Sequence, residues 1–375
     1  MDGFLTLFIM GIGYMIVPRF RNIPLASVKL AYVSFLLILA SLIFQFIQTT
    51  IDDDKNLLIW IMISKLSGVV IFLIIVFWTL RVRPKLLGLS DYFITLSLVT
   101  LITVNMIELS EYRYSNSLTH IQLWLLFPVL MIFGIEYKTL PAFLGFIRPR
   151  KTSAIASLVF IFICIILGLV SIIFMNIPLL PIIFNVTLFA SVLTFASAIY
   201  AFKGFDNREI LRLIQGEKKD RYNFTVIHVK VSFLFLFIGI AIAILFSIIG
   251  QSFVFYDIVI HSIAIGFIGL TIALYLPLML PPIIGKIIHF TNFNKIPLLL
   301  IILSLSIRAV GDFVLAQPLS SFPSEYIGSS SLQILTYSFG LSGWFIVVAM
   351  LVFVIMIHKS MKEVNPLPSS NTNPF

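Results

Sequence analysis

The sequence contains five histidines, the side chains best suited to bind a metal or transfer a proton near neutral pH. His120 and His261 each stand at the start of a long apolar run. Two imidazoles from facing helices can bind one haem iron axially, because neutral imidazole is a good iron ligand. Histidines also gather at membrane boundaries because the ring is amphipathic, so a boundary role is the alternative. His228 is a weaker ligand candidate, and His289 and His358 are typical of loop and boundary positions.

Four further ionisable residues stand inside or beside apolar runs, where a charge costs at least ~2.5 kcal/mol in a bilayer. Arg308 and Asp312 are four residues apart, close enough to pair within one helix. That pair would lock the helix to its neighbours, or Arg308 would hold a haem propionate. Asp257 stands four residues before His261 and is expected to orient its ring through a hydrogen bond. Lys65 lies in the middle of a run and therefore requires a partner.

A short motif occurs twice at identical spacing. Residues 11–20 read GIGYMIVPRF and residues 134–143 read GIEYKTLPAF, so that Gly, Ile, Tyr, Pro and Phe recur at the same offsets. Tyr275 and Pro281 repeat the theme more loosely. Such an internal repeat predicts a repeated structural unit.

The second copy of the motif carries two charges. Glu136 and Lys138 flank Tyr137 near the end of an apolar run. The two charges suit either an ion pair at the membrane boundary or a point of proton entry.

The longest apolar stretch, residues 256–285, has a small-residue face. Ser262, Gly266, Gly269 and Ala273 share one side of an α-helix. Small residues let a neighbouring helix or a flat ligand approach closely, and helix packing is the more common use.

The composition excludes a soluble globular protein. Of 375 residues, 60% are hydrophobic and 11% are charged, whereas average usage is about 25% charged. We expect an all-α polytopic helical bundle in the lipid bilayer of the cell membrane. The formal charge of +9 is then a matter of membrane topology, and no nucleic-acid partner is expected. The single cysteine, Cys164, excludes a disulfide within the chain and metal sites built from several of its thiolates.

Apolar runs of about 18 residues or more identify the membrane spans. The sequence predicts eleven, the first of them short: 3–17, 25–48, 57–80, 92–109, 119–144, 153–175, 178–202, 225–250, 256–284, 294–316 and 331–358. They form a single transmembrane domain over residues 1–362. Residues 363–375 are polar and rich in proline, which predicts a disordered cytoplasmic tail. The loop 203–223 has the charges and helical spacing of a short amphipathic surface helix.

The basic residues predict the orientation of the spans. Eighteen of the 25 Lys and Arg fall in alternate loops and the C-terminal flank, and the opposite loops hold only Lys55 and Arg113. Because cytoplasmic loops are rich in Lys and Arg, we expect a cytoplasmic C-terminus and an extracytoplasmic N-terminus. For an outside N-terminus without a signal peptide we expect either that a helix preceding Met1 is missing or that the start codon was assigned late; the prediction for this chain stays at eleven spans. The repeated motif then predicts three parallel four-helix units, the first lacking its first helix.

Two consecutive helices carry a family resemblance: one begins with a histidine and contains glycines, and the next ends in an arginine followed, after two residues, by Gly-Asp. HSIAIGFIGLTIALYLPLMLPPIIG followed by LSIRAVGDF resembles the NnrS-like family, which is distantly related to subunit I of the haem–copper oxidases. The resemblance implies an association with haem b and with copper, in a respiratory or nitric-oxide-related system with cytochrome or other respiratory subunits as partners. Under it, one set of residues would surround the haem, and a second set would ligate metal. The first is His120, His261, Asp257 and Arg308, and the second is His120, His261 and His228.

The chain also departs from that family. Asp2 and Gly3 stand where the family would be expected to place a histidine, and Tyr275 stands where a histidine often precedes a proline. No histidine pair has the spacing of the oxidases' copper site, so oxygen reduction is not expected.

These features predict a haem-associated accessory or electron-transfer subunit without a catalytic centre of its own. A secondary transporter is the first alternative, with Lys65, Arg308 and Asp312 as a midplane site and inverted rather than parallel repeats. The second alternative is a membrane anchor subunit of a cytochrome complex that binds no haem itself.

Overall fold

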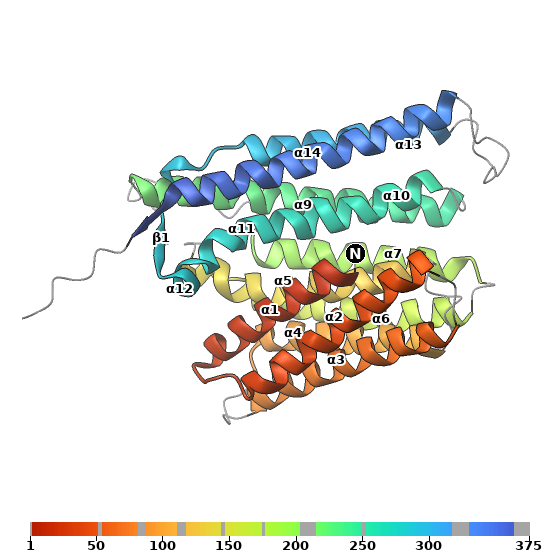
Figure 1. The fold of residues 1–375 in the computed structure, drawn as a ribbon, viewed down its shortest axis with the longest axis horizontal. Helices are drawn as coiled ribbons and strands as arrows, with labels where there is room; N and C mark the ends of the chain where they lie inside the picture. The colour runs from red at the N-terminus through yellow and green to blue at the C-terminus, as the bar shows by residue number, and fades with distance from the viewer. Residues whose placement is uncertain are drawn as a thin grey trace, which may run out of the picture. The chain divides into compact units, whose positions relative to one another are not determined.

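The computed structural model describes most of the chain as long helices (Figure 1). The described residues are 2–51, 55–81, 87–110, 118–143, 147–174, 177–202, 215–249, 253–316 and 330–363. They divide into two compact units. Unit 1 comprises Met1–Pro141 and Pro149–Ala198, and unit 2 comprises Ala142–Arg148 and Ile199–Phe375.

Unit 1 is built from seven helices in chain order. They are α1 (Asp2–Arg21), α2 (Val28–Ile51), α3 (Lys55–Arg81), α4 (Leu89–Ser110), α5 (Leu118–Phe143, in this unit up to Pro141), α6 (Lys151–Ile173) and α7 (Leu179–Ala198). The closest neighbours are consecutive helices, α2 with α3 and α6 with α7. Short connections favour such side-by-side packing of successive helices.

Unit 2 begins with the long helix α9 (Glu217–Ile249). The next run is continuous but changes its winding: α10 (Phe253–His261), a π-helical stretch (Ser262–Gly269), α11 (Leu270–Met279) and the short α12 (Pro281–Ile284). A 3-10 turn (Phe290–Asn292) precedes α13 (Ile296–Ala316), and α14 (Ser330–Ser360) lies beside α13. Gly285 has φ +65° and ends α12, a left-handed conformation that glycine adopts without steric cost.

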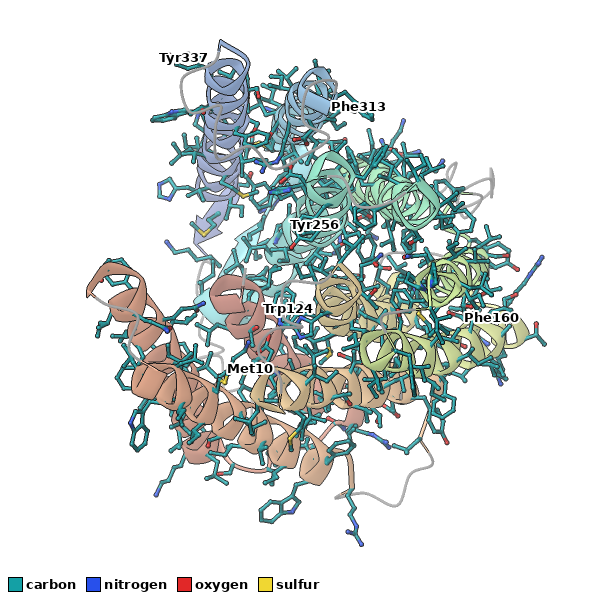
Figure 2. All side chains as sticks on the ribbon, turned by 90° about the vertical axis from the view of Figure 1, so that its right-hand side faces the viewer. Met10, Trp124, Phe160, Tyr256, Phe313 and Tyr337 are labelled. Carbon is teal, nitrogen blue, oxygen red and sulfur yellow. The ribbon has the colours of Figure 1, made fainter. Side chains whose placement is uncertain are left out.

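The helices confirm the predicted all-α membrane fold. Among the described residues, ten helical segments are long and apolar enough to cross a membrane, and α1 is the eleventh long helix. Each corresponds in order to one predicted span. Large apolar side chains project outward from both units, as lipid-facing positions require, and Tyr337 on α14 is 75% exposed (Figure 2). The grouping into three parallel four-helix units and the orientation of the termini stay predictions.

Serine hydroxyls join the helices within each unit. Each donates to a backbone carbonyl of a neighbouring helix rather than of its own, at 2.7–3.0 Å. The donor and acceptor residues are Ser34 and Gly68, Ser64 and Leu37, Ser90 and Gly134, Ser97 and Phe127, Ser157 and Ser191, and Ser304 and Ser342. Small polar residues at helix contacts allow close approach and add hydrogen bonds where water is absent. These contacts fix the registers of the helix pairs.

Two short strands form the one sheet among the described residues. β1 (Lys286–Ile288) pairs antiparallel with β2 (Met361–Glu363). Glu363, the first residue of the predicted tail, therefore lies in a strand opposite Lys286, and the rest of that tail lies outside the described residues. Most of the predicted amphipathic loop helix, residues 203–214, also lies outside them, while α9 already begins at Glu217.

Candidate functional site

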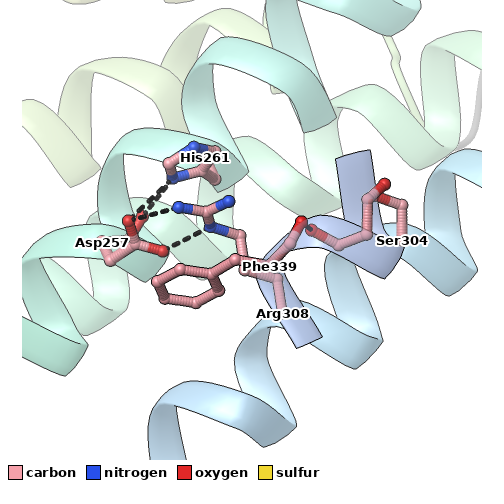
Figure 3. Close-up of polar contacts among 6 residues, drawn as sticks. Asp257, His261, Ser304, Arg308 and Phe339 are labelled. Atoms are coloured by element: carbon pink, nitrogen blue, oxygen red, sulfur yellow. Dashed lines mark hydrogen bonds and ion pairs between the residues drawn. The ribbon is translucent and has the colours of Figure 1, made fainter. Parts of the chain in front are cut away.

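Two adjacent helices of unit 2 bring four ionisable side chains together. Asp257 and His261 lie one turn apart on α10, and Arg308 and Asp312 lie one turn apart on α13. Figure 3 shows Arg308 reaching from α13 to the carboxylate of Asp257, with His261 above the same carboxylate. We call these four residues the unit 2 cluster.

Arg308 binds Asp257 through two nitrogens. Its Nε lies 2.5 Å from Oδ2 of Asp257, and a terminal nitrogen lies 2.8 Å from Oδ1. The guanidinium also covers the ring of Phe339 on α14, with 4.2 Å from Cζ to the ring centroid. Bidentate pairing and stacking on an aromatic face are the two contacts for which arginine is best suited. Together they hold the guanidinium in one orientation between three helices.

His261 is oriented by the residue one turn before it. Its Nδ1 lies 2.9 Å from the backbone oxygen of Asp257 and 3.4 Å from Oδ1 of the same residue. A proton on Nδ1 satisfies both acceptors, so Nε2 is the basic nitrogen of the neutral ring. The hydrogen bond of His261 goes to the main-chain oxygen of Asp257, and the carboxylate expected to orient the ring is the more distant partner.

Asp312 has a different environment from Asp257. The residue is 1% exposed, and among the described residues no N–H group or hydroxyl donates to either carboxylate oxygen. Its carboxyl lies within hydrogen-bond range of the Asp257 carboxyl, and Arg308 is its other electrostatic neighbour. The predicted pair of Arg308 with Asp312 within α13 does not form among the described residues. Arg308 pairs instead with Asp257 on α10, to which Nε and one terminal nitrogen both donate.

A cavity of about 250 Å³ opens beside the cluster. His261, Arg308 and Asp312 line it together with two serine hydroxyls and apolar side chains. The remaining lining residues are Ser262, Ser306, Ala309, Phe235, Ile238, Ile242, Ile258, Leu305 and Phe313. The lining thus combines ionisable and apolar side chains. The volume lies below the ~300–1,000 Å³ typical of sites for drug-sized ligands.

The helix winding changes directly after His261. Residues Ser262–Gly269 are π-helical, a rare winding that is frequent at functional sites. Gly266 in this stretch lies against Phe235 of α9, where a Cβ would come within 2.5 Å of Cγ. The small-residue face therefore serves close helix packing at Gly266, which is the more common use considered above.

Unit 1 holds a second cluster, formed by Lys65 of α3, Glu108 of α4 and His120 of α5. Lys65 Nζ lies 2.7 Å from Oε2 of Glu108, and His120 Nε2 lies 3.9 Å from Oε1. Lys65 thus has the partner that its position within a span requires. Glu108 was not predicted as a site residue, since it stands at the end of an apolar run where an exposed boundary position is the usual expectation.

The other predicted residues are distributed over both units. His120 lies in unit 1, and Asp257, His261 and Arg308 lie in unit 2. His228 is buried on α9 of unit 2, where Nδ1 lies 2.8 Å from the backbone oxygen of Phe224. Within the described part of the chain, no group of three or more His, Cys, Asp or Glu side chains is placed to hold a metal ion. The residue that sequence reasoning missed in unit 2 is Phe339, one aromatic among many in an apolar helix.

Neither a protein-family model nor a curated protein matches this sequence.

Proposed function

We propose that this multi-pass membrane protein is a secondary transporter that exchanges a small organic cation for protons at the unit 2 cluster. The observation that carries the proposal is the excess of carboxylates over cations beside a cavity. Arg308 is matched by the bidentate carboxylate of Asp257, and Asp312 adds a second carboxylate that lines the cavity. Intramembrane ionisable residues are costly, and their usual reason is a substrate or ion path.

The charge balance of the cluster selects the class of solute. Two neighbouring carboxyls with one arginine between two helices are unfavourable when both are ionised, unless a proton or a cation compensates the second charge. A proton and an organic cation therefore compete for Asp312, which is the elementary requirement for exchange of one against the other. The apolar side chains of Phe235 and Leu305 would contact the hydrocarbon part of the solute, while Ser306 offers a hydroxyl to its polar part. The small volume restricts the solute to a few heavy atoms.

The π-helical stretch supplies the element that such exchange needs. The stretch begins directly after His261 and contains Gly266, which packs against Phe235 of α9. Phe235 also lines the cavity. A change of winding there would move His261 and Asp257 relative to α13. Transporters commonly place broken or irregular helices at their binding sites.

Transport in energised membrane vesicles tests the proposal. A fluorescent amine dye reports an acid-inside pH gradient, and small amines such as ethanolamine, choline and putrescine are added in turn. We expect at least one to dissipate the gradient in vesicles with the intact protein and none to do so with Asp312→Asn. Asp312→Glu is the matched control, because it keeps the charge. Equal dissipation by the intact protein and Asp312→Asn would remove Asp312 from the transport path.

A haem-associated role is the second proposal, and His261 is the residue that favours it. Its Nδ1 is held by Asp257, which leaves Nε2 as the nitrogen available for a metal, and the residue lines the cavity. Haem b, with or without copper, would supply electron transfer between respiratory partners. The residues fit this group only in part, because Arg308, the residue expected to hold a propionate, is already engaged by Asp257.

An absorption spectrum of the purified protein separates the two proposals. A reduced Soret band that is lost in His120→Ala and in His261→Ala, and kept in His358→Ala, would support the haem role. Absence of the band in protein that retains its fold would leave the transport proposal alone.

A further inference from the structure

Unit 1 contains a carboxyl group that the proposed function does not use. Glu136 on α5 is fully buried, with 0% of the residue exposed. In the described part of the chain, neither Oε1 nor Oε2 has a hydrogen-bond partner, and no charged group interacts with the side chain. Few buried acids are left in this state, because an isolated buried carboxylate is among the most costly groups in a protein.

The neighbouring charges have other partners. Lys138, two residues away, donates from Nζ to the backbone oxygen of Phe20 at 2.7 Å and lies over the Phe20 ring. Arg21 on α1 forms an ion pair with Asp91 on α4 at 3.1 Å. The predicted boundary pair of Glu136 with Lys138 therefore does not form among the described residues. Lys138 and Arg21 each have a partner other than Glu136.

The titratable groups on the helices that contact this part of α5 give no alternative counter-charge. Among the described side chains, α1 offers Tyr14, Arg19 and Arg21, α4 offers Asp91, Tyr92 and Glu108, and α7 carries no titratable residue. Arg19 and Tyr92 are exposed, and Glu108 pairs with Lys65.

Packing keeps Glu136 in the interior. Ser90 on α4 donates to the backbone oxygen of Gly134 at 2.9 Å, and a Cβ at Gly134 would come within 2.9 Å of the Ser90 backbone oxygen. On the same segment, the ring of Phe133 stacks on Phe195 of α7 with 3.8 Å between centroids. α5 cannot rotate here without losing both contacts. The carboxyl is thus held in the interior, without a charged neighbour among the described residues.

We infer that Glu136 is a proton-binding site of unit 1, occupied in the resting protein as a neutral carboxylic acid. Uptake of one proton removes the buried charge and needs no movement of α5. Release of that proton would create an unpaired charge, so it requires that a cation or water reach the site. Glu136 therefore couples proton release to an opening of unit 1. This inference is independent of the transport proposal, whose residues all lie in unit 2.

Infrared spectroscopy of the purified full-length protein at neutral pH tests the inference. A protonated carboxylic acid has a carbonyl stretch that is separate from the bands of carboxylates and amides. The spectrum of the intact protein minus that of Glu136→Gln should contain one such carbonyl band. Glu108→Gln is the matched control, because Glu108 pairs with Lys65, and its difference spectrum should instead show loss of a carboxylate band. A carboxylate band in the Glu136→Gln difference spectrum would overturn the inference.

A labelling experiment covers the case in which Glu136→Gln does not fold. Hydrophobic carbodiimides react with protonated carboxyls that water-soluble reagents do not reach. We expect peptide mass spectrometry of the intact protein, treated with dicyclohexylcarbodiimide, to find the adduct on Glu136 and not on Asp91. Labelling that spares Glu136 would contradict the inference. Asp312→Asn should leave labelling of Glu136 unchanged, so that failure of the transport proposal and failure of this inference remain distinguishable.

Discussion

Each unit pairs a cation with a carboxylate inside its membrane spans, but the two pairs are built differently. In unit 1, three helices each supply one group, and Lys65 touches Glu108 through a single contact of 2.7 Å. In unit 2, one helix supplies both carboxylate and imidazole, and Arg308 binds Asp257 through two contacts while it stacks on Phe339. Both clusters combine a cation, a carboxylate and a histidine. The unit 2 cluster alone adds a second carboxylate, Asp312, and borders a cavity.

The difference indicates separate roles for the two clusters. A lysine is a point charge, and its pair with Glu108 compensates both charges where α3 meets α4. The arginine fork is rigid and directional, so it fixes the position of Asp257, and under the transport proposal a ligand would compensate Asp312. On this view the unit 1 cluster stabilises the helices of unit 1, and the unit 2 cluster is the proposed binding site for the solute.

Removal of the arginine should have the largest effect. Arg308→Ala leaves Asp257 and Asp312 close together without the guanidinium, and breaking such a pair typically costs about 3–5 kcal/mol. We expect the lower end of that range, since the Arg308 side chain is 21% exposed. Thermal unfolding of the purified protein in detergent measures the loss. Arg308→Lys should recover only part of it, because lysine cannot form the bidentate contact; full recovery would show that charge alone matters.

The lysine of unit 1 should have a smaller effect that a second change can reverse. Lys65→Met leaves Glu108 without its donor, at a cost of about 1–3 kcal/mol. Lys65→Met combined with Glu108→Gln should regain most of the lost stability, since no uncompensated charge remains. The same melting experiment applies. A double variant as unstable as the single one would mean that the pair does more than balance charge.

Loss of the stacked aromatic should have the smallest effect. Phe339→Leu keeps the apolar volume near α13 but removes the ring face under the guanidinium, which is worth about 0.5–2 kcal/mol. Combining it with Arg308→Lys gives a double-mutant cycle, and we expect the two changes to be less than additive. Strict additivity would indicate that Phe339 only fills space.

Hydropathy alone was sufficient to predict the spans but not their ends. An apolar run ends where lipid ends, whereas a helix continues as long as its backbone hydrogen bonds do. α9 therefore begins at Glu217, eight residues before the predicted 225, and its first turns carry charges. The π-helical stretch after His261 was not predictable, because the same residues also fit an α-helix with a small-residue face.

The sequence singled out all four residues of the unit 2 cluster but not the way in which they pair. Spacing within one helix correctly placed Asp257 beside His261, since a separation of four residues is a local property. The same rule suggested a pair of Arg308 with Asp312, whereas Arg308 pairs with Asp257 on the neighbouring helix. Which face of α13 meets α10 depends on packing, and no local pattern in the sequence records it. For the same reason the sequence showed that Lys65 requires a partner without identifying Glu108.

The central claim is that Asp312 binds the positive charge of a solute in the unit 2 cavity, and ligand-induced stabilisation tests it most directly. A bound ligand at 100 times its dissociation constant stabilises the folded state by about 2.7 kcal/mol. Thermal unfolding of the intact protein, Asp312→Asn and Asp312→Glu would be measured with and without saturating ethanolamine, choline or putrescine. We predict that at least one amine raises the midpoint of the intact protein and of Asp312→Glu and leaves Asp312→Asn unchanged. An equal rise in Asp312→Asn, or no rise in the intact protein with any of the amines, would contradict the claim.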